Sequence, residues 1–301
     1  MEPTTVVYIA GYGRSGSTLL DLLLGRLDGW FSMGEFRLFW WALRDHWRCG
    51  CGHDVEDCPV WSAVLADAKV APVLDVIADL RETVRVRRVP ALVRPALLGS
   101  HRAARDRFAA TLDAIYGSTQ RVTGARVLVD SSKDPMYGLV MCSLPNVRVH
   151  VVHLVRDSRA VTFSWQRKKA RPEIEKKEAF LPQHGPLHTS LEWDLRHSLV
   201  QVLGREAPAY TRVTYEALAS DPIGTLDRIT EAVVGRSATE LGASFERREV
   251  ENHTVAGNPM RFQPVGLDLR VDEEWRGALP ARDRRLVTTL TYPLLRKYGY
   301  H

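Results

Sequence analysis

The chain has 301 residues, of which 45% are hydrophobic and 26% charged, and its formal net charge at pH 7 is +5. This composition can bury a sizeable core. No apolar run is long enough to cross a bilayer, and the first expected strand begins so early that no signal peptide fits before it. We therefore expect a cytoplasmic protein without a membrane span. No basic helix carries interleaved aromatic residues, which argues against a nucleic-acid partner.

The apolar run Val6–Ala10 predicts a buried strand, and the leucine-rich run after it predicts a helix over Ser17–Leu27. Between them, residues 11–18 read Gly-Tyr-Gly-Arg-Ser-Gly-Ser-Thr, which keeps the glycines and the threonine of a Walker-type phosphate loop. Ser17 stands where such a loop has the lysine that neutralises a triphosphate, and Arg14 lies within the loop. Backbone N–H groups at the helix N-terminus still bind a phosphate. The loop therefore suits a nucleotide with a shorter, less charged 5′ chain than a triphosphate.

The next part of the chain carries no convincing strand from about Glu35 to Gly117. Amphipathic segments punctuated by prolines predict helices there instead. We therefore expect a single domain over 1–301 with a mostly helical insertion at about 36–120.

Three cysteines lie within this insertion, Cys49, Cys51 and Cys58, with His46 and His53 nearby. The pattern could hold Zn²⁺, but its spacing is not one of the stronger zinc signatures and no second C-x-x-C pair exists. A disulfide is disfavoured in a reducing compartment. We favour reduced structural cysteines and assign no metal, while a zinc site and a disulfide both stay open.

Three further apolar runs predict strands over 126–130, 147–155 and 210–214. Helices are expected at Arg159–Lys169, Leu187–Gly204, Pro222–Val234 and Pro280–Tyr298. Continuous apolar strands that alternate with helices predict an α/β fold, a P-loop-type three-layer sandwich with a central parallel sheet and helices on both faces. Ligands of such sheets bind outside the carboxyl ends of the strands. Polar residues follow all four predicted strands there, namely Arg14, Ser15, Ser132, Lys133, Arg156, Ser158, Tyr215 and Glu216.

A second phosphate site is predicted from Arg156, at the end of its strand, and Ser164, about two turns into the following helix. The two side chains can hold one phosphate, because arginine supplies a bidentate fork of donors. Together with the loop at 11–18, this pair indicates a nucleotide phosphorylated at both its 5′ and 3′ positions.

These motifs resemble those of sulfotransferases that use 3′-phosphoadenosine 5′-phosphosulfate (PAPS). Residues 8–20 resemble their 5′-phosphosulfate loop, and 155–160 with Ser164 resemble their 3′-phosphate motif. Residues 213–222 resemble their Y-E-x-L…D-P element, and 253–261 resemble a C-terminal loop of bacterial members. The resemblance implies PAPS as donor, and it implies donor contacts at Gly13, Arg14, Ser15, Gly16, Ser17, Thr18, Arg156, Ser164, Tyr215 near the adenine, and Arg261 closing over the 3′-phosphate.

The resemblance also implies catalytic roles for three residues. Sulfuryl transfer should pass through a loose, in-line transition state, so catalysis rests on positioning and on stabilising the leaving phosphate oxygen. Lys133 matches the position that lines the reacting centre, with Arg14 beside it, and no metal is required. Glu35 matches the base of Golgi-type members, although it could instead cap a helix or pair with Arg37.

The predicted function is therefore transfer of a sulfuryl group from PAPS to a hydroxyl of a small-molecule or carbohydrate acceptor. The alternatives are a non-catalytic nucleotide-binding or scaffold protein on the same fold, and a P-loop kinase of small metabolites. The charged segment 167–185 either forms a lid over the acceptor or is a solvated loop. The sequence leaves open the identity of the acceptor and the choice between monomer and homodimer.

Overall fold

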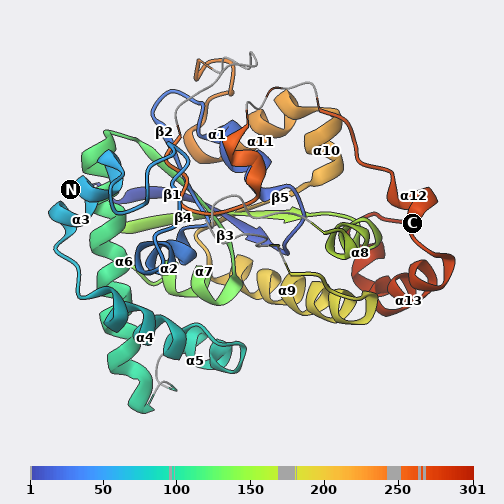
Figure 1. Ribbon diagram of the computed structural model, residues 1–301, viewed down its shortest axis with the longest axis horizontal. Helices are drawn as coiled ribbons and strands as arrows, with labels where there is room; N and C mark the ends of the chain where they lie inside the picture. Colours follow the sequence, from blue (N-terminus) through green and yellow to red (C-terminus); the bar gives the residue numbers. More distant parts are fainter. Residues whose placement is uncertain are drawn as a thin grey trace.

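The computed structural model describes residues 2–94, 97, 99–168, 180, 182–242, 252–263, 266 and 269–301. A five-stranded sheet lies at its centre, in the order β2-β3-β1-β4-β5, and every neighbouring pair is parallel (Figure 1). The strands are β1 (Thr4–Gly11), β2 (Trp30–Gly34), β3 (Val127–Lys133), β4 (Val147–Val155) and β5 (Ala209–Thr214).

Helices cover both faces of this sheet (Figure 1). One face carries α1 (Ser17–Leu24), α10 (Tyr215–Ser220) and α11 (Pro222–Val234). The other carries α2 (Phe39–Arg44), α6 (Arg102–Thr123), α7 (Pro135–Met141) and α9 (Pro186–Glu206). Helices α12 (Trp275–Ala278) and α13 (Ala281–Lys297) pack against α8 (Ser158–Gln166), and η5 (Pro259–Phe262) packs against α1. The fold is therefore the predicted P-loop-type α/β sandwich with a parallel central sheet.

The central strand β1 is apolar throughout because both of its faces are covered. All eight of its residues are buried. Val7 and Ile9 pack with the α1 and α11 side, while Val6 and Tyr8 pack with the opposite layer. Side chains alternate between the two faces of a strand, so a strand buried on both faces reads as a continuous apolar run.

The region after β2 is helical where the structure describes it. It holds η1 (Phe36–Leu38), α2, α3 (Pro59–Ala68), α4 (Val73–Thr83), η2 (Val86–Arg88), α5 (Val89–Val93), η4 (Gly99–His101) and α6. Figure 1 shows α4 and α5 at the lower left, below the sheet and beside α6. The predicted organisation as a single domain with an insertion stays a prediction.

Strand β2 was not predicted, and the first helix is shorter than predicted. The β2 sequence, Trp-Phe-Ser-Met-Gly, is short and lacks a clear period, and its pairing with β3 is what makes it a strand. Helix α1 ends at Leu24, not at Leu27, where the backbone N–H of Gly25 closes the last turn.

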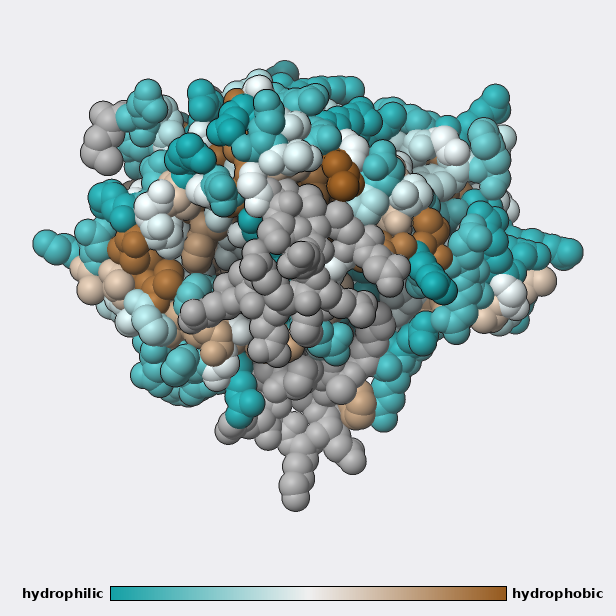
Figure 2. Space-filling view, turned by 90° about the horizontal axis from the view of Figure 1, so that it is seen from above, coloured by the Kyte–Doolittle hydropathy of each residue, from teal (hydrophilic) through white to brown (hydrophobic). Residues whose placement is uncertain are grey.

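Within the described ranges, no helix is long and apolar enough to cross a membrane. On the face seen in Figure 2, hydrophilic residues predominate, and the hydrophobic ones stand in small separate groups.

Candidate active site

The loop between β1 and α1 has the conformation of a phosphate cradle. Gly16 is the N-cap of α1 and has φ of 87°, in the left-handed region that favours glycine. A Cβ on Gly16 would lie 2.7 Å from the ring of Tyr215, and one on Gly13 would lie 2.7 Å from the ring of Trp165. Glycine at these two positions therefore lets two aromatic rings close on the loop, which lines a cavity.

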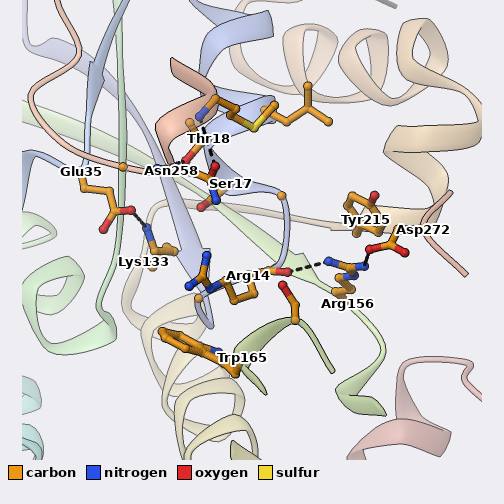
Figure 3. Close-up of a pocket in the computed structure, with 16 residues that line it drawn as sticks. Arg14, Ser17, Thr18, Glu35, Lys133, Arg156, Trp165, Tyr215, Asn258 and Asp272 are labelled. Carbon is orange, nitrogen blue, oxygen red and sulfur yellow. Dashed lines mark hydrogen bonds and ion pairs between the residues drawn. The ribbon is translucent and has the colours of Figure 1, made fainter. Parts of the chain in front are cut away.

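That cavity has a volume of about 360 Å³ and opens at the carboxyl ends of the strands (Figure 3). It is lined by Gly13, Arg14, Gly16, Ser17, Thr18, Leu19, Glu35, Lys133, Arg156, Ser164, Trp165, Tyr215, Gly257, Asn258, Met260 and Asp272.

Arg14 lies at the middle of the cavity in Figure 3 and is short of anionic partners. Its guanidinium stacks 4.7 Å from the ring centroid of Trp165. Its Nε and Nη2 atoms are buried and have no hydrogen-bond partner among the described residues. Desolvation lowers the pKa of Arg14, and the charge of Glu35 acts in the opposite direction. Buried donors of a cation are costly to leave without an acceptor, so the cavity is suited to an anionic ligand.

Arg156 forms the second cationic group of the cavity. It is only 6% exposed. Its Nη1 donates to the carbonyl oxygen of Arg14 at 2.9 Å, and its Nη2 donates to Asp272 Oδ2 at 3.0 Å. The guanidinium also stacks on Tyr215, 4.2 Å from the ring centroid, and its buried Nε has no partner among the described residues. Ser164 lines the same cavity. Asp272 thus supplies an anion to the group that was predicted to hold a 3′-phosphate.

Glu35 and Lys133 form an ion pair on another wall of the cavity, with 2.6 Å between Nζ and Oε1. Glu35 follows β2 and Lys133 is the last residue of the neighbouring strand β3, so the two lie at adjacent carboxyl ends. The β1–β3 register shifts between Tyr8 and Ala10, and beside this irregularity Lys133 has φ of 66°. Such bulges re-aim side chains near functional sites. The alternatives of a helix cap or a pair with Arg37 are not what is observed, because the side chain of Glu35 makes no capping bond and binds Lys133.

A buried polar network beneath this pair fixes its geometry. Asp130 accepts hydrogen bonds from the backbone and hydroxyl of Ser132 and from the hydroxyl of Tyr116. Ser132 Oγ in turn accepts the backbone N–H of Arg37 at 2.8 Å, which ties η1 to β3. Burial raises the pKa of Asp130 to about 6, against these hydrogen bonds, which lower it. The network holds the segment that follows Glu35 against the strand that carries Lys133.

The structure brings most of the predicted site residues into one cavity, with two exceptions. Ser15 is buried beside the cavity and its Oγ has no partner among the described residues. Arg261 does not line the cavity: it is 1% exposed and donates to the carbonyl oxygens of Thr254 and Arg48. In the structure its planar guanidinium holds two backbone segments together, and its predicted place over a 3′-phosphate stays a prediction.

The loop that carries Arg261 contributes other residues to the cavity. Gly257, Asn258 and Met260 line it, and the backbone N–H of Asn258 donates to Thr18 Oγ1 at 3.1 Å. The sequence analysis missed Trp165 and Asp272 as site residues. Trp165 adjoins the predicted Ser164, so its position was a usable signal, whereas no motif marked Asp272. Most of the predicted lid, 167–185, lies outside the described residues.

The family model described as "Sulfotransferase family" matches residues 7–234. The chain belongs to the sulfotransferase family. Membership in this family supports an enzyme with sulfotransferase activity. Most residues that line the cavity lie within the matched range, and Gly257, Asn258, Met260 and Asp272 lie after it. No curated protein matches this chain in sequence.

Two solved sulfotransferase domains share the fold. The sulfotransferase domain from the Synechococcus PCC 7002 olefin synthase is 20% identical, with a TM-score of 0.54, and the match covers 100% of this chain and 96% of that one. The sulfotransferase domain from the curacin biosynthetic pathway is 15% identical, with the same TM-score of 0.54, and the match covers 100% and 99%. At these identities the likeness concerns the fold alone.

Proposed function

We propose that this sulfotransferase uses PAPS as its donor and transfers the sulfuryl group to a hydroxyl of a small-molecule or carbohydrate acceptor. The donor's two charged ends would lie at two of the cavity's cationic groups, with the loop and Arg14 at one and Arg156 at the other. The acceptor hydroxyl would approach from the side of Glu35.

The 5′ end of the donor fits the loop. The N-terminus of α1 offers backbone N–H groups to a phosphate, and Arg14 adds donors that have no partner among the described residues. A phosphosulfate carries less charge than a triphosphate with its Mg²⁺. The serine at position 17, in place of a lysine, agrees with that smaller charge. No metal is needed in this scheme.

The 3′ end of the donor fits Arg156 and Ser164. A 3′-phosphate would take over the contact that Asp272 makes with Nη2, and it would reach the unused Nε. Tyr215 packs beneath the guanidinium and against Gly16, so its ring separates the two phosphate sites. From that position the ring of Tyr215 would contact the donor's nucleoside.

The transfer itself needs a base and a cation. The acceptor oxygen attacks sulfur while the bond from sulfur to the 5′-phosphate oxygen breaks, and the electron pair stays on that oxygen. Glu35 takes the acceptor's proton. Lys133 and Arg14 stabilise the charge that develops on the leaving oxygen. The products are the sulfate ester and adenosine 3′,5′-bisphosphate (PAP).

The observation that carries this proposal is the half-buried guanidinium of Arg14 beside a helix N-terminus, whose buried Nε and Nη2 have no hydrogen-bond partner among the described residues. The test is calorimetric titration of the full chain with PAP and PAPS. Hydrogen bonds to charged groups contribute about 1.5–3 kcal/mol each, so Arg14→Ala should weaken donor binding roughly ten- to hundredfold. Arg121→Ala is the matched control, because Arg121 pairs with Asp67 away from the cavity. Equal affinities for both variants would contradict the assignment.

A further inference from the structure

Four metal-ligating side chains converge at a place that the proposed reaction does not use. They are Cys49, Cys51, Cys58 and His253, and their ligand atoms all lie within 4.8 Å of one another. The first three come from the insertion, and His253 follows Cys58 by 195 residues. Cys49 and Cys58 are fully buried. All three cysteines are free thiols.

The spacing of the ligand atoms is that of a tetrahedral zinc site. Zinc–sulfur bonds of about 2.3 Å and zinc–nitrogen bonds of about 2.0–2.1 Å place tetrahedral ligands roughly 3.8 Å apart for two sulfurs and roughly 3.6 Å for sulfur and nitrogen. The Sγ atoms of Cys49 and Cys51 lie 3.6 and 3.7 Å from Cys58 Sγ, and His253 Nδ1 lies 3.3 Å from it. Two sulfurs and one nitrogen at these distances from Cys58 Sγ suit a shared ion.

The backbone around the cluster fixes the ligands before any ion arrives. Cys49 donates its N–H to the carbonyl of His53 at 2.7 Å, and Gly52 donates to the carbonyl of Cys49 at 3.0 Å, which makes a tight turn. The turn passes through Gly52, whose φ of 90° favours glycine. Trp61 Nε1 donates to the carbonyl of His253 at 2.7 Å. Both segments are therefore tied to each other beside the cluster.

We propose that Cys49, Cys51, Cys58 and His253 bind one structural Zn²⁺. Four protein ligands close the coordination sphere and leave no position for a substrate, as in structural rather than catalytic zinc sites. His253 supplies the fourth ligand, which the spacing of the three cysteines alone does not identify.

The ion would stabilise one wall of the cavity through the segment that follows His253. Val255 donates its N–H to the carbonyl of Met33, and the carbonyl of Ala256 accepts the N–H of Glu35. Asn258 then contacts the phosphate loop at Thr18. The zinc site therefore links the insertion to the segment that positions both the loop and Glu35, without touching the cavity itself.

The test measures metal content first, so it does not depend on the proposed reaction. Full-length protein from zinc-supplemented cells, dialysed and assayed by inductively coupled plasma mass spectrometry, should carry about one zinc per chain. Cys58→Ser and His253→Ala should lose most of it. Cys142→Ser is the matched control, because Cys142 lies outside the cluster. His253→Cys keeps a ligand set that zinc accepts and should retain the metal.

Cobalt gives a second readout on the wild-type chain, which does not require a variant to fold. Titration of metal-stripped protein with Co²⁺ should produce thiolate-to-cobalt charge-transfer bands and the visible bands of tetrahedral cobalt, and Zn²⁺ should abolish them. Stripping should also lower the melting temperature, and added zinc should restore it. Wild-type protein with far less than one zinc per chain and without cobalt bands would overturn the proposal, as would full zinc retention by Cys58→Ser.

Discussion

The ion pair between Arg156 and Asp272 leads to a prediction: substituting its two partners should change PAP affinity in opposite directions. If a 3′-phosphate takes the place of the Asp272 carboxylate, then Arg156→Ala removes a donor contact, whereas Asp272→Asn removes a competitor. We expect weaker PAP binding for the first variant and tighter binding for the second. A role for Asp272 in merely orienting Arg156 would instead weaken binding in both.

The size of the Asp272 effect follows from the geometry. At the observed 3.0 Å, unit charges attract by about 5.5 kcal/mol at an effective dielectric of about 20. The side chain of Asp272 is 37% exposed, however, so solvent screens the pair, and exposed pairs contribute about 0–1 kcal/mol. We therefore expect about 1 kcal/mol, or a roughly fivefold gain in PAP affinity for Asp272→Asn. In Arg156→Ala, the loss of charged hydrogen bonds, at about 1.5–3 kcal/mol each, should weaken PAP binding by ten- to hundredfold.

Isothermal titration calorimetry with PAP measures both constants, and a double-mutant cycle isolates their coupling. In the Arg156→Ala background, Asp272→Asn should change PAP affinity little, because no guanidinium remains for the carboxylate to block. Weaker binding by Asp272→Asn alone, or the same gain in both backgrounds, would refute the competition.

Three further predictions concern the reacting pair and a buried acid. Glu35→Gln should reduce turnover by about 10²–10⁴-fold with PAP affinity preserved, as expected for a general base, and full activity in a sulfate-transfer assay would move the base elsewhere. Lys133→Ala should lower kcat far more than donor affinity, and equal losses would restrict its role to binding. Burial raises the pKa of Asp21 to about 8, so the folded state binds its proton more tightly than the unfolded state does. Stability should therefore fall by up to about 1.4 kcal/mol per pH unit as pH rises from about 4 to about 8. Asp21→Asn should flatten that slope in urea unfolding at several pH values, and an unchanged slope would place the titration on another group.

Much of the fold was predictable because its signals are local. Helix α11 has the predicted bounds, since Asp221 caps its N-terminus, Pro222 occupies its first turn and Gly235 ends it with φ of 69°. Strand β2 was not predictable in this way, because five residues that include a serine and a glycine become a strand through pairing with β3.

The candidate site likewise has features that local sequence predicts and features that it does not. Parallel strands place their carboxyl ends at one edge, so residues such as Lys133 and Arg156 could be grouped from the sequence. Three features depend on contacts between distant segments and could not be. Asp272 pairs with a residue 116 positions away, and His253 meets Cys58 from 195 positions away. Arg261 donates hydrogen bonds to backbone carbonyls that no sequence motif marks.

The charges of the cavity also suggest an order of binding. Its lining includes the cations Arg14, Lys133 and Arg156 and the carboxylates Glu35 and Asp272. In the structure each carboxylate pairs with one of these cations, so Lys133 contacts the group proposed as the base. An anionic donor would draw Lys133 toward its leaving oxygen and so release Glu35 to accept a proton. We therefore expect the donor to bind first. In initial-rate kinetics, PAP should then compete with PAPS but not with the acceptor, and competition with both substrates would indicate random binding and an already available base.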